Sequence, residues 1–147
     1  MPERGGPSDK IGNRYEDLWM SLSMTEVMDE HARAIHIQPT ESKVKGIDFI
    51  IIRNGIREYC QVKSYCTDLG KWTISKLAGG KRKSNVLKNF KTILCENENA
   101  RCLFLSAHAA YELQELSYRA TKASTLADFL TNLSSALAKK LDLLHKK

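Results

Sequence analysis

Long hydrophobic runs are missing from this sequence of 147 residues. No stretch approaches the ~18 consecutive apolar residues that a membrane-spanning helix requires. Residues 1–10 are rich in charge, proline and glycine, and they lack the apolar core of a secretion signal. We therefore expect a soluble, cytoplasmic protein with no membrane partner, in which residues 1–10 form a flexible lead-in.

Cysteine is scarce, and its spacing gives no indication of a zinc site or a disulfide framework. The four cysteines include no C-x-x-C pair. Two of them, Cys60 and Cys102, fall inside apolar runs where a small buried thiol packs well. The histidines are also few and lack the spacing of a shared ligand face, so none is given a catalytic role: His31, His36, His108 and His145.

What the sequence does have is an ordinary globular composition with an excess of positive charge. Hydrophobic residues make up 42% and charged residues 27% of the chain. A chain of this length builds one hydrophobic core, so we expect a single domain over residues 11–147. The formal net charge of +6 favours an acidic partner such as nucleic acid.

Hydrophobic periodicity predicts an α/β fold. Apolar side chains recur at helical spacing between residues 11 and 33, which indicates a long opening helix. Apolar segments bounded by turn residues predict four strands, at residues 34–38, 46–53, 56–63 and 101–106. Further helices are expected around Ser75, at residues 81–95, near residues 109–120, and from Thr125 onward as one leucine-rich helix.

The pair Asn54-Gly55 predicts a two-residue hairpin turn between the second and third strands. Counting back from this turn places Asp48 opposite Gln61 and Gly46 opposite Lys63. Because side chains alternate along a strand, Asp48, Gln61 and Lys63 project to the same side. The flanking residues on both faces are apolar, so an acid and a lysine set into this surface need partners: either they form a structural salt bridge or they hold a cation.

The sequence Gly46-Ile47-Asp48, then a hairpin, then Gln61-Val62-Lys63, resembles the D-x(n)-(D/E/Q)-x-K signature of PD-(D/E)XK nucleases. Residues 59–63 and 71–77 also look like the endonuclease effector domains of bacterial anti-phage systems, which are N-terminal modules fused to a cyclic-oligonucleotide sensor or to a STAND NTPase. The resemblance thus implies that residues 11–147 are the N-terminal module of a longer protein. The resemblance covers roughly residues 11–133. The chain departs from the strict signature in two ways, because no proline precedes Asp48 and Gln61 replaces the second acid.

The resemblance implies a Mg²⁺ site for phosphodiester hydrolysis, where a hard cation polarises the phosphate and activates water. Asp48 would be the main metal ligand, with the Gln61 amide oxygen and the Val62 backbone carbonyl as further oxygen donors. Lys63 would orient the attacking water and stabilise the developing negative charge. Gln61 is a neutral ligand, so it contributes less charge than the acid it replaces.

The family often adds an acid from the first helix, and here Glu16 and Asp17 compete for that role. On a helical wheel Glu16 lies at the edge of the apolar stripe whereas Asp17 points away, so Glu16 is the preferred metal ligand and catalytic acid. A solvated helix acid is the competing interpretation of Glu16. Glu41 ranks behind it, because Glu41 falls in a loop of unknown direction.

A basic segment follows the predicted site, and its residues are candidates for contacts with phosphates: Lys71, Lys81, Arg82, Lys83 and Lys88. Charge runs of this kind also form ordinary solvated faces. Trp72, which lies beside this segment, is interpreted as a packing residue rather than a base-stacking one.

The sequence thus predicts a restriction-endonuclease-like core, a central mixed sheet whose hairpin carries the site, flanked by helices. The expected function is a Mg²⁺-dependent endonuclease for double-stranded DNA, an anti-phage effector activated when a fused or associated sensor assembles it into a homo-oligomer. Two alternatives stay open. One is a catalytically weak or inactive nucleic-acid-binding module of the same fold, and the other is an oligomerisation scaffold built on the last helix.

Overall fold

The computed structural model describes residues 7–37, 39, 46–64, 71–79 and 85–145. The chain divides into two compact units. The first, here called the sheet unit, comprises Met1–Tyr65 and Asn89–Ala107, and the second, the helical unit, comprises Cys66–Lys88 and His108–Lys147. The expectation of one domain over residues 11–147 did not include this division, and it stays a prediction.

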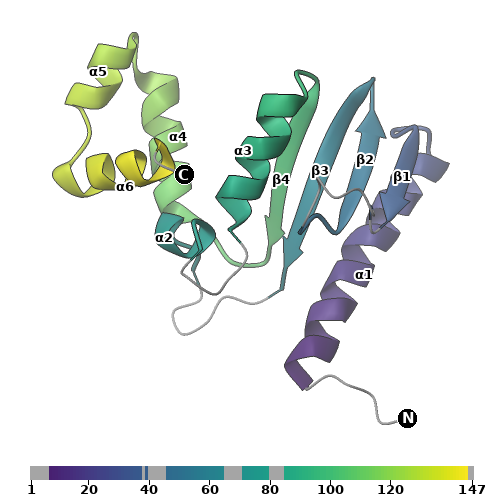
Figure 1. The fold of residues 1–147 in the computed structure, drawn as a ribbon. Helices are drawn as coiled ribbons and strands as arrows, with labels where there is room; N and C mark the ends of the chain where they lie inside the picture. Colours follow the sequence, from purple (N-terminus) through teal and green to yellow (C-terminus); the bar gives the residue numbers. More distant parts are fainter. Residues whose placement is uncertain (1–6, 38, 40–45, 65–70, 80–84, 146–147) are drawn as a thin grey trace. The chain divides into compact units, whose positions relative to one another are not determined.

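The sheet unit contains a four-stranded mixed sheet in the order β1-β2-β3-β4 (Figure 1). Strand β2 pairs antiparallel with β1 and with β3, and β4 pairs parallel with β3. The predicted mixed sheet with flanking helices is confirmed. The elements are α1 (Pro7–Met28), β1 (Ala34–Ile37), β2 (Phe49–Arg53), β3 (Ile56–Lys63), α3 (Val86–Glu96) and β4 (Ala100–Ser106).

The hairpin between β2 and β3 has the predicted turn and register. Asn54 and Gly55 both have positive φ, as a two-residue turn of type I′ requires. The pairs run from Arg53 with Ile56 to Phe49 with Cys60, which is the register counted from the sequence. The side-chain positions near the site therefore follow from one turn dipeptide.

The second strand begins later than predicted, at Phe49 rather than at residue 46. Gly46 has φ +81°, a left-handed conformation that interrupts the extended backbone. Alternation therefore does not extend back to Ile47, which packs with Ile50 and Tyr59. Regular alternation along a strand that began at residue 46 would place Ile47 on the opposite face from those two residues.

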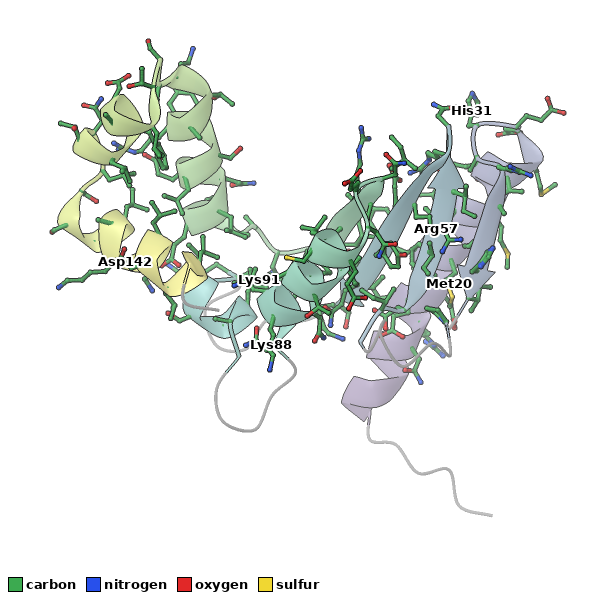
Figure 2. The ribbon with its side chains drawn as sticks, turned by 45° about the horizontal axis from the view of Figure 1, so that its top comes forward. Met20, His31, Arg57, Lys88, Lys91 and Asp142 are labelled. Atoms are coloured by element: carbon green, nitrogen blue, oxygen red, sulfur yellow. The ribbon has the colours of Figure 1, made fainter. Side chains whose placement is uncertain are left out.

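The core of the sheet unit lies on both faces of the sheet. On one face, side chains from α1 pack against Phe49 and Val62, among them Trp19 and Met20, of which Met20 is labelled in Figure 2. On the other face, Phe90 and Ile93 of α3 pack against residues of β2 and β3. Residues 58–62 of β3 are all buried, as expected for a central strand covered from both sides. An ionisable group near this strand is consequently shielded from water.

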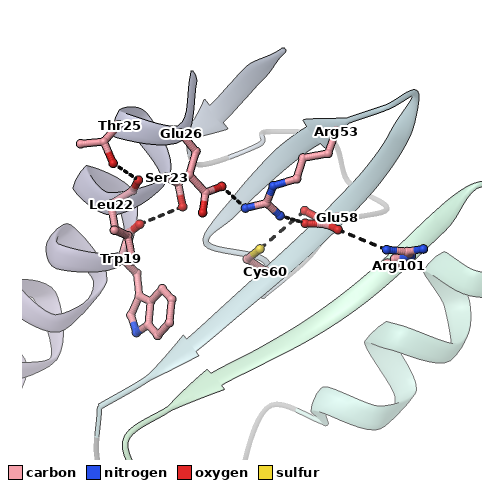
Figure 3. Close-up of polar contacts among 9 residues, drawn as sticks. All are labelled: Trp19, Leu22, Ser23, Thr25, Glu26, Arg53, Glu58, Cys60 and Arg101. Carbon is pink, nitrogen blue, oxygen red and sulfur yellow. Dashed lines mark hydrogen bonds and ion pairs between the residues drawn. The ribbon is translucent and has the colours of Figure 1, made fainter. Parts of the chain in front are cut away.

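A charged network ties α1 to the turn end of the hairpin (Figure 3). Arg53 donates hydrogen bonds to Glu26 of α1 and to Glu58 of β3. Arg101 of β4 adds a second cation, with 3.7 Å between its Nη1 and a Glu58 carboxylate oxygen. Glu58 is only 6% exposed, so these partners compensate a carboxylate that burial would otherwise penalise.

The helical unit contains α2 (Ile74–Leu77), α4 (Tyr111–Lys122), α5 (Leu126–Thr131) and α6 (Ser135–His145). Glu112 joins three of these helices. One of its carboxylate oxygens accepts a 2.8 Å hydrogen bond from the Ile74 backbone N–H, and the other lies 3.3 Å from the Lys140 ammonium. Lys140 also donates to the Ser75 hydroxyl at 3.0 Å.

The single leucine-rich helix predicted from Thr125 onward is two helices. Thr125 caps α5 by accepting from the Asp128 backbone N–H, and α5 ends at Thr131. Ser134 then accepts from the Leu137 backbone N–H and begins α6. Leucine periodicity continues across this break, but polar residues at 132 and 134 supply new helix ends. A continuous helix for oligomerisation is therefore not formed.

Other boundaries differ modestly from the sequence expectation. Helix α1 begins at Pro7, so residues 7–10 of the expected lead-in are helical, and it ends at Met28 because Glu30 adopts φ 60°. The remaining differences are small: β1 ends at Ile37, β4 begins at Ala100, α3 ends at Glu96 and α4 spans Tyr111–Lys122. Within the described residues, no helix is long and apolar enough to span a membrane.

Candidate active site

Asp48 is fixed beside the end of β3 by two hydrogen bonds. Its backbone N–H donates to the Cys60 carbonyl at 2.9 Å, and its carboxylate accepts from the Val62 backbone N–H at 2.6 Å. Asp48 precedes β2 by one residue, so these bonds, rather than regular strand geometry, place its side chain. The result is a partly buried carboxylate adjacent to the backbone of Gln61 and Val62, as the hairpin register predicts.

The surroundings of Asp48 oppose its ionisation. Burial raises the pKa of Asp48, and the Val62 hydrogen bond and the positive charge of Lys63 only partly offset this effect. A carboxylate that is costly to ionise is stabilised by a bound cation. A cation bound beside Asp48 would therefore lower the cost of its negative charge.

Glu16 of α1 belongs to the same charged cluster. Burial raises the pKa of Glu16, the negative charge of Asp48 raises it further, and Lys63 lowers it. The structure thus brings Glu16, Asp48 and Lys63 within electrostatic range of one another. Asp17 is exposed, which agrees with the choice of Glu16 over Asp17. Glu41, the other candidate acid, lies outside the described residues.

Gln61 is the most unusual polar residue of the site. Its side chain is 1% exposed, and its carbonyl oxygen Oε1 has no hydrogen-bond partner in the described structure. Leaving a buried acceptor unsatisfied costs about 1–3 kcal/mol. Such a cost is removed if the oxygen coordinates a cation or a water, so the orphaned Oε1 fits the ligand role predicted for Gln61.

The donor set suits a hard cation. Glu16 and Asp48 supply carboxylates, and Gln61 and the Val62 carbonyl supply neutral oxygens, which are the ligands that Mg²⁺ prefers. The described residues contain no group of three or more His, Cys, Asp or Glu side chains suited to hold a metal. A metal held here would therefore rely on two carboxylates and on neutral oxygens, with less compensating charge than a three-acid site.

The charge of these carboxylates leads to a pH prediction. Because burial raises the pKa of Asp48, the folded state binds its proton more tightly than the unfolded state. The metal-free protein therefore loses stability as pH rises from the pKa of Asp48 in the unfolded state through its higher pKa in the folded state. Asp48→Asn keeps an oxygen acceptor for the Val62 N–H but removes the charge. We expect the metal-free variant to melt at a higher temperature than the wild type at pH 8, with a smaller difference at pH 5.

Thermal melting in EDTA at both pH values would measure this difference. Asp142→Asn is the matched control, because it removes the same charge from an exposed position on α6. If the Asp48→Asn difference failed to grow with pH, burial would not be opposing the ionisation of Asp48.

Asn89 of α3 is a site neighbour that the sequence analysis missed. A Cβ atom added to Gly46 would lie 2.9 Å from Asn89 Nδ2 and 3.7 Å from Gln61 Nε2. Both amides thus approach Gly46, the residue that begins the turn carrying Asp48. No local signal distinguishes Asn89 in the sequence, because only the packing of α3 on the sheet brings it to this position.

The contrast between Gly46 and Gly55 gives a second prediction. Both have positive φ, so alanine at either position should cost roughly 1–2 kcal/mol of stability from backbone strain. Only at Gly46 would the new methyl group displace Asn89, since nothing lies within 4 Å at Gly55. We expect Gly46→Ala to lower metal-dependent activity roughly 10- to 100-fold, because small misplacements of ligands are costly, and Gly55→Ala to leave it unchanged.

Urea denaturation and a cleavage assay on the two folded variants would separate these effects. Equal activity of Gly46→Ala and Gly55→Ala would mean that the Asn89 contact does not shape the site.

The predicted phosphate contacts fall in the helical unit or outside the described residues. Lys71 and Lys88 are exposed residues of the helical unit. Lys81, Arg82 and Lys83 lie outside the described residues. Trp72 is half-buried, as a packing residue would be. Its backbone N–H donates to the Ala109 carbonyl at 2.9 Å.

Comparisons of the chain with protein-family models, with curated proteins and with solved structures gave no match.

Proposed function

We propose that the sheet unit is a metal-dependent nuclease of the PD-(D/E)XK type that hydrolyses phosphodiester bonds in double-stranded DNA. One observation carries the proposal: the carboxylate of Asp48 accepts from the Val62 N–H and lies within electrostatic range of Glu16 and Lys63. The residue before Val62, Gln61, is buried, and its Oε1 has no hydrogen-bond partner among the described residues. The hairpin and parallel fourth strand are also compatible with a restriction-endonuclease-like core.

The residues have distinct roles in this proposal. Glu16, Asp48, Gln61 and the Val62 carbonyl would hold Mg²⁺, which supplies polarisation of the phosphate and a lowered pKa of water. Lys63 positions the attacking water and stabilises the negative charge that develops on the phosphate. Glu16 acts as a metal ligand, because a bound cation would stabilise the carboxylate whose pKa burial raises in the metal-free protein. The attacking water gives its proton to solvent, and the leaving oxygen takes a proton from solvent. The water oxygen bonds to phosphorus as the bond to the leaving deoxyribose oxygen breaks.

The resemblance to anti-phage effectors leads us to propose that assembly controls the activity. A sensor domain, fused or associated, would bring copies of the chain together. Helix α1 offers one surface for such contacts, because it exposes large apolar side chains that a monomer usually covers: Leu18, Leu22, Met24 and Met28.

A nucleic-acid-binding module without turnover is the second candidate function. The observation that favours it is the neutral amide of Gln61, which binds a divalent cation less strongly than a carboxylate. The scaffold alternative loses its main support, because the leucine-rich segment forms two short helices rather than one.

Plasmid cleavage by a forced oligomer tests the proposal. The chain would be fused to an oligomerising partner to raise its local concentration, and cleavage would be compared in Mg²⁺ and in EDTA. Cleavage that needs metal, Asp48 and Lys63 is expected. If the fused protein bound the plasmid without cutting it in both conditions, and Asp48→Ala behaved like the wild type, the nuclease proposal would be contradicted and the binding module favoured.

A further inference from the structure

Positive charge is distributed unequally between the two units. The helical unit contains twelve Lys and Arg residues against five Asp and Glu, a formal charge of +7. The sheet unit contains eleven against twelve, a formal charge of −1, and the two together give the +6 of the whole chain. The basic character of the protein therefore resides in the unit that lacks the candidate active site.

The acids of the helical unit are largely engaged in internal contacts. Glu112 binds the Ile74 N–H and Lys140, and Glu115 lies 2.6 Å from Arg119. The carboxylate of Asp128 accepts from the Ser124 backbone N–H at 3.0 Å and from the Asn132 amide at 2.7 Å. Asp142 on α6, labelled in Figure 2, is the remaining acid among the described residues of this unit.

Most of the cations among the described residues of this unit stand at exposed positions. They occur on α2, on α4, on α6 and at the start of α3, where Figure 2 shows Lys88. The exposed lysines are Lys71, Lys76, Lys88, Lys122 and Lys139. Lys122 also lies 5.8 Å from the centre of the Tyr118 ring, which is itself exposed. This combination of exposed cations with an accessible aromatic ring is common where proteins contact nucleic acid.

We propose that the helical unit is the docking surface for the phosphodiester backbone of duplex DNA. The inference rests on the proposed function, because it takes the nuclease substrate as the ligand. Two carboxylates in the candidate site repel a phosphate, and the sheet unit as a whole carries no positive excess, so affinity for DNA must come from elsewhere. Contacts to phosphates alone give binding that is insensitive to base sequence and strongly dependent on salt.

Duplex DNA fits this surface better than an anionic membrane does. Membrane-surface helices carry lysines along one face and expose a continuous apolar face on the other. Here the lysines are spread over several short helices that bond to one another through Glu112 and Lys140. Cations spread over a folded cluster of this kind can contact several phosphates of a duplex.

Salt-dependent binding of the full chain to a short fluorescent DNA duplex, in EDTA so that no cleavage occurs, tests the inference. The test variant is Lys122→Gln with Lys139→Gln, and the control is Arg33→Gln with Lys91→Gln, which neutralises two exposed cations of the sheet unit. Each lost phosphate contact should reduce the slope of log affinity against log salt by ~0.9. We expect a shallower slope and weaker binding for the test variant alone.

The outcomes separate this inference from the nuclease proposal. An unchanged slope in the test variant, an equal loss in the control, or tighter binding to phosphatidylserine vesicles than to the duplex would overturn the docking surface. If plasmid is cut under those results, the nuclease proposal stands without it. If the wild type binds the duplex through Lys122 and Lys139 but the forced oligomer never cuts, the docking surface stands and the nuclease fails.

Discussion

Replacing Lys63 by methionine is expected to lower the rate of metal-dependent cleavage by about 10³-fold, the size of effect seen when one transition-state charge donor is removed. Methionine has a similar length and retains the apolar part of the lysine side chain, so packing at the end of β3 is preserved. The ammonium that faces Asp48 and Glu16 is lost. Mg²⁺ should still bind, and more tightly, because two carboxylates then lack their positive neighbour.

Single-turnover cleavage of supercoiled plasmid by the forced oligomer would measure the rate, and a melting curve with and without Mg²⁺ would show that the metal still binds. Lys91→Met is the control, because it removes the same charge from an exposed position on α3. A Lys63→Met protein that cuts at a rate close to that of Lys91→Met would remove Lys63 from the catalytic machinery.

Replacing Gln61 by glutamate should have opposite effects on the metal-free and metal-bound protein. Without metal, a third carboxylate is buried near Asp48, and we expect a loss of roughly 2–4 kcal/mol in the free energy of unfolding. With Mg²⁺, the new carboxylate replaces the unpartnered Oε1 as a charged ligand. We therefore expect the Mg²⁺ concentration for half-maximal stabilisation to fall by about tenfold or more.

Thermal melting across a Mg²⁺ titration gives both quantities from one experiment. Gln114→Glu, at an exposed position on α4, adds the same charge and controls for general binding of cations to a more acidic protein. If Mg²⁺ stabilised Gln61→Glu no more than Gln114→Glu, Gln61 would not be a metal ligand, and the orphaned oxygen would need a bound water instead.

The hairpin that carries the site could be predicted in detail because its information is local. Asn54 and Gly55 define the turn, and the turn defines the register that places Asp48 beside Gln61. The choice of Glu16 over Asp17 also agrees with the structure, since a helical wheel needs only neighbouring residues. These inferences required no knowledge of distant parts of the chain.

The features that escaped prediction depend on conformation or on long-range packing. The positive φ of Gly46 ends the strand early, and a glycine is compatible with either outcome. Asn89 reaches the site only because α3 packs on the sheet. The leucine periodicity of the last segment continues across the break between α5 and α6, and hydrophobic periodicity alone does not reveal helix-capping residues. The division into two units follows from contacts between residues far apart in sequence.

The charged network at the turn end of the hairpin fixes α1 at one point along its length. Arg53 donates a hydrogen bond to Glu26, which lies ten residues beyond Glu16, or about 15 Å along the helix axis. A tilt of the helix by about 5° about that contact would displace the Glu16 carboxylate by more than about 1 Å. A displacement of this size would disrupt the coordination of a metal bound by Glu16. A partner that binds the exposed side of α1 could therefore move Glu16 relative to Asp48 by tilting the helix about the contact between Glu26 and Arg53.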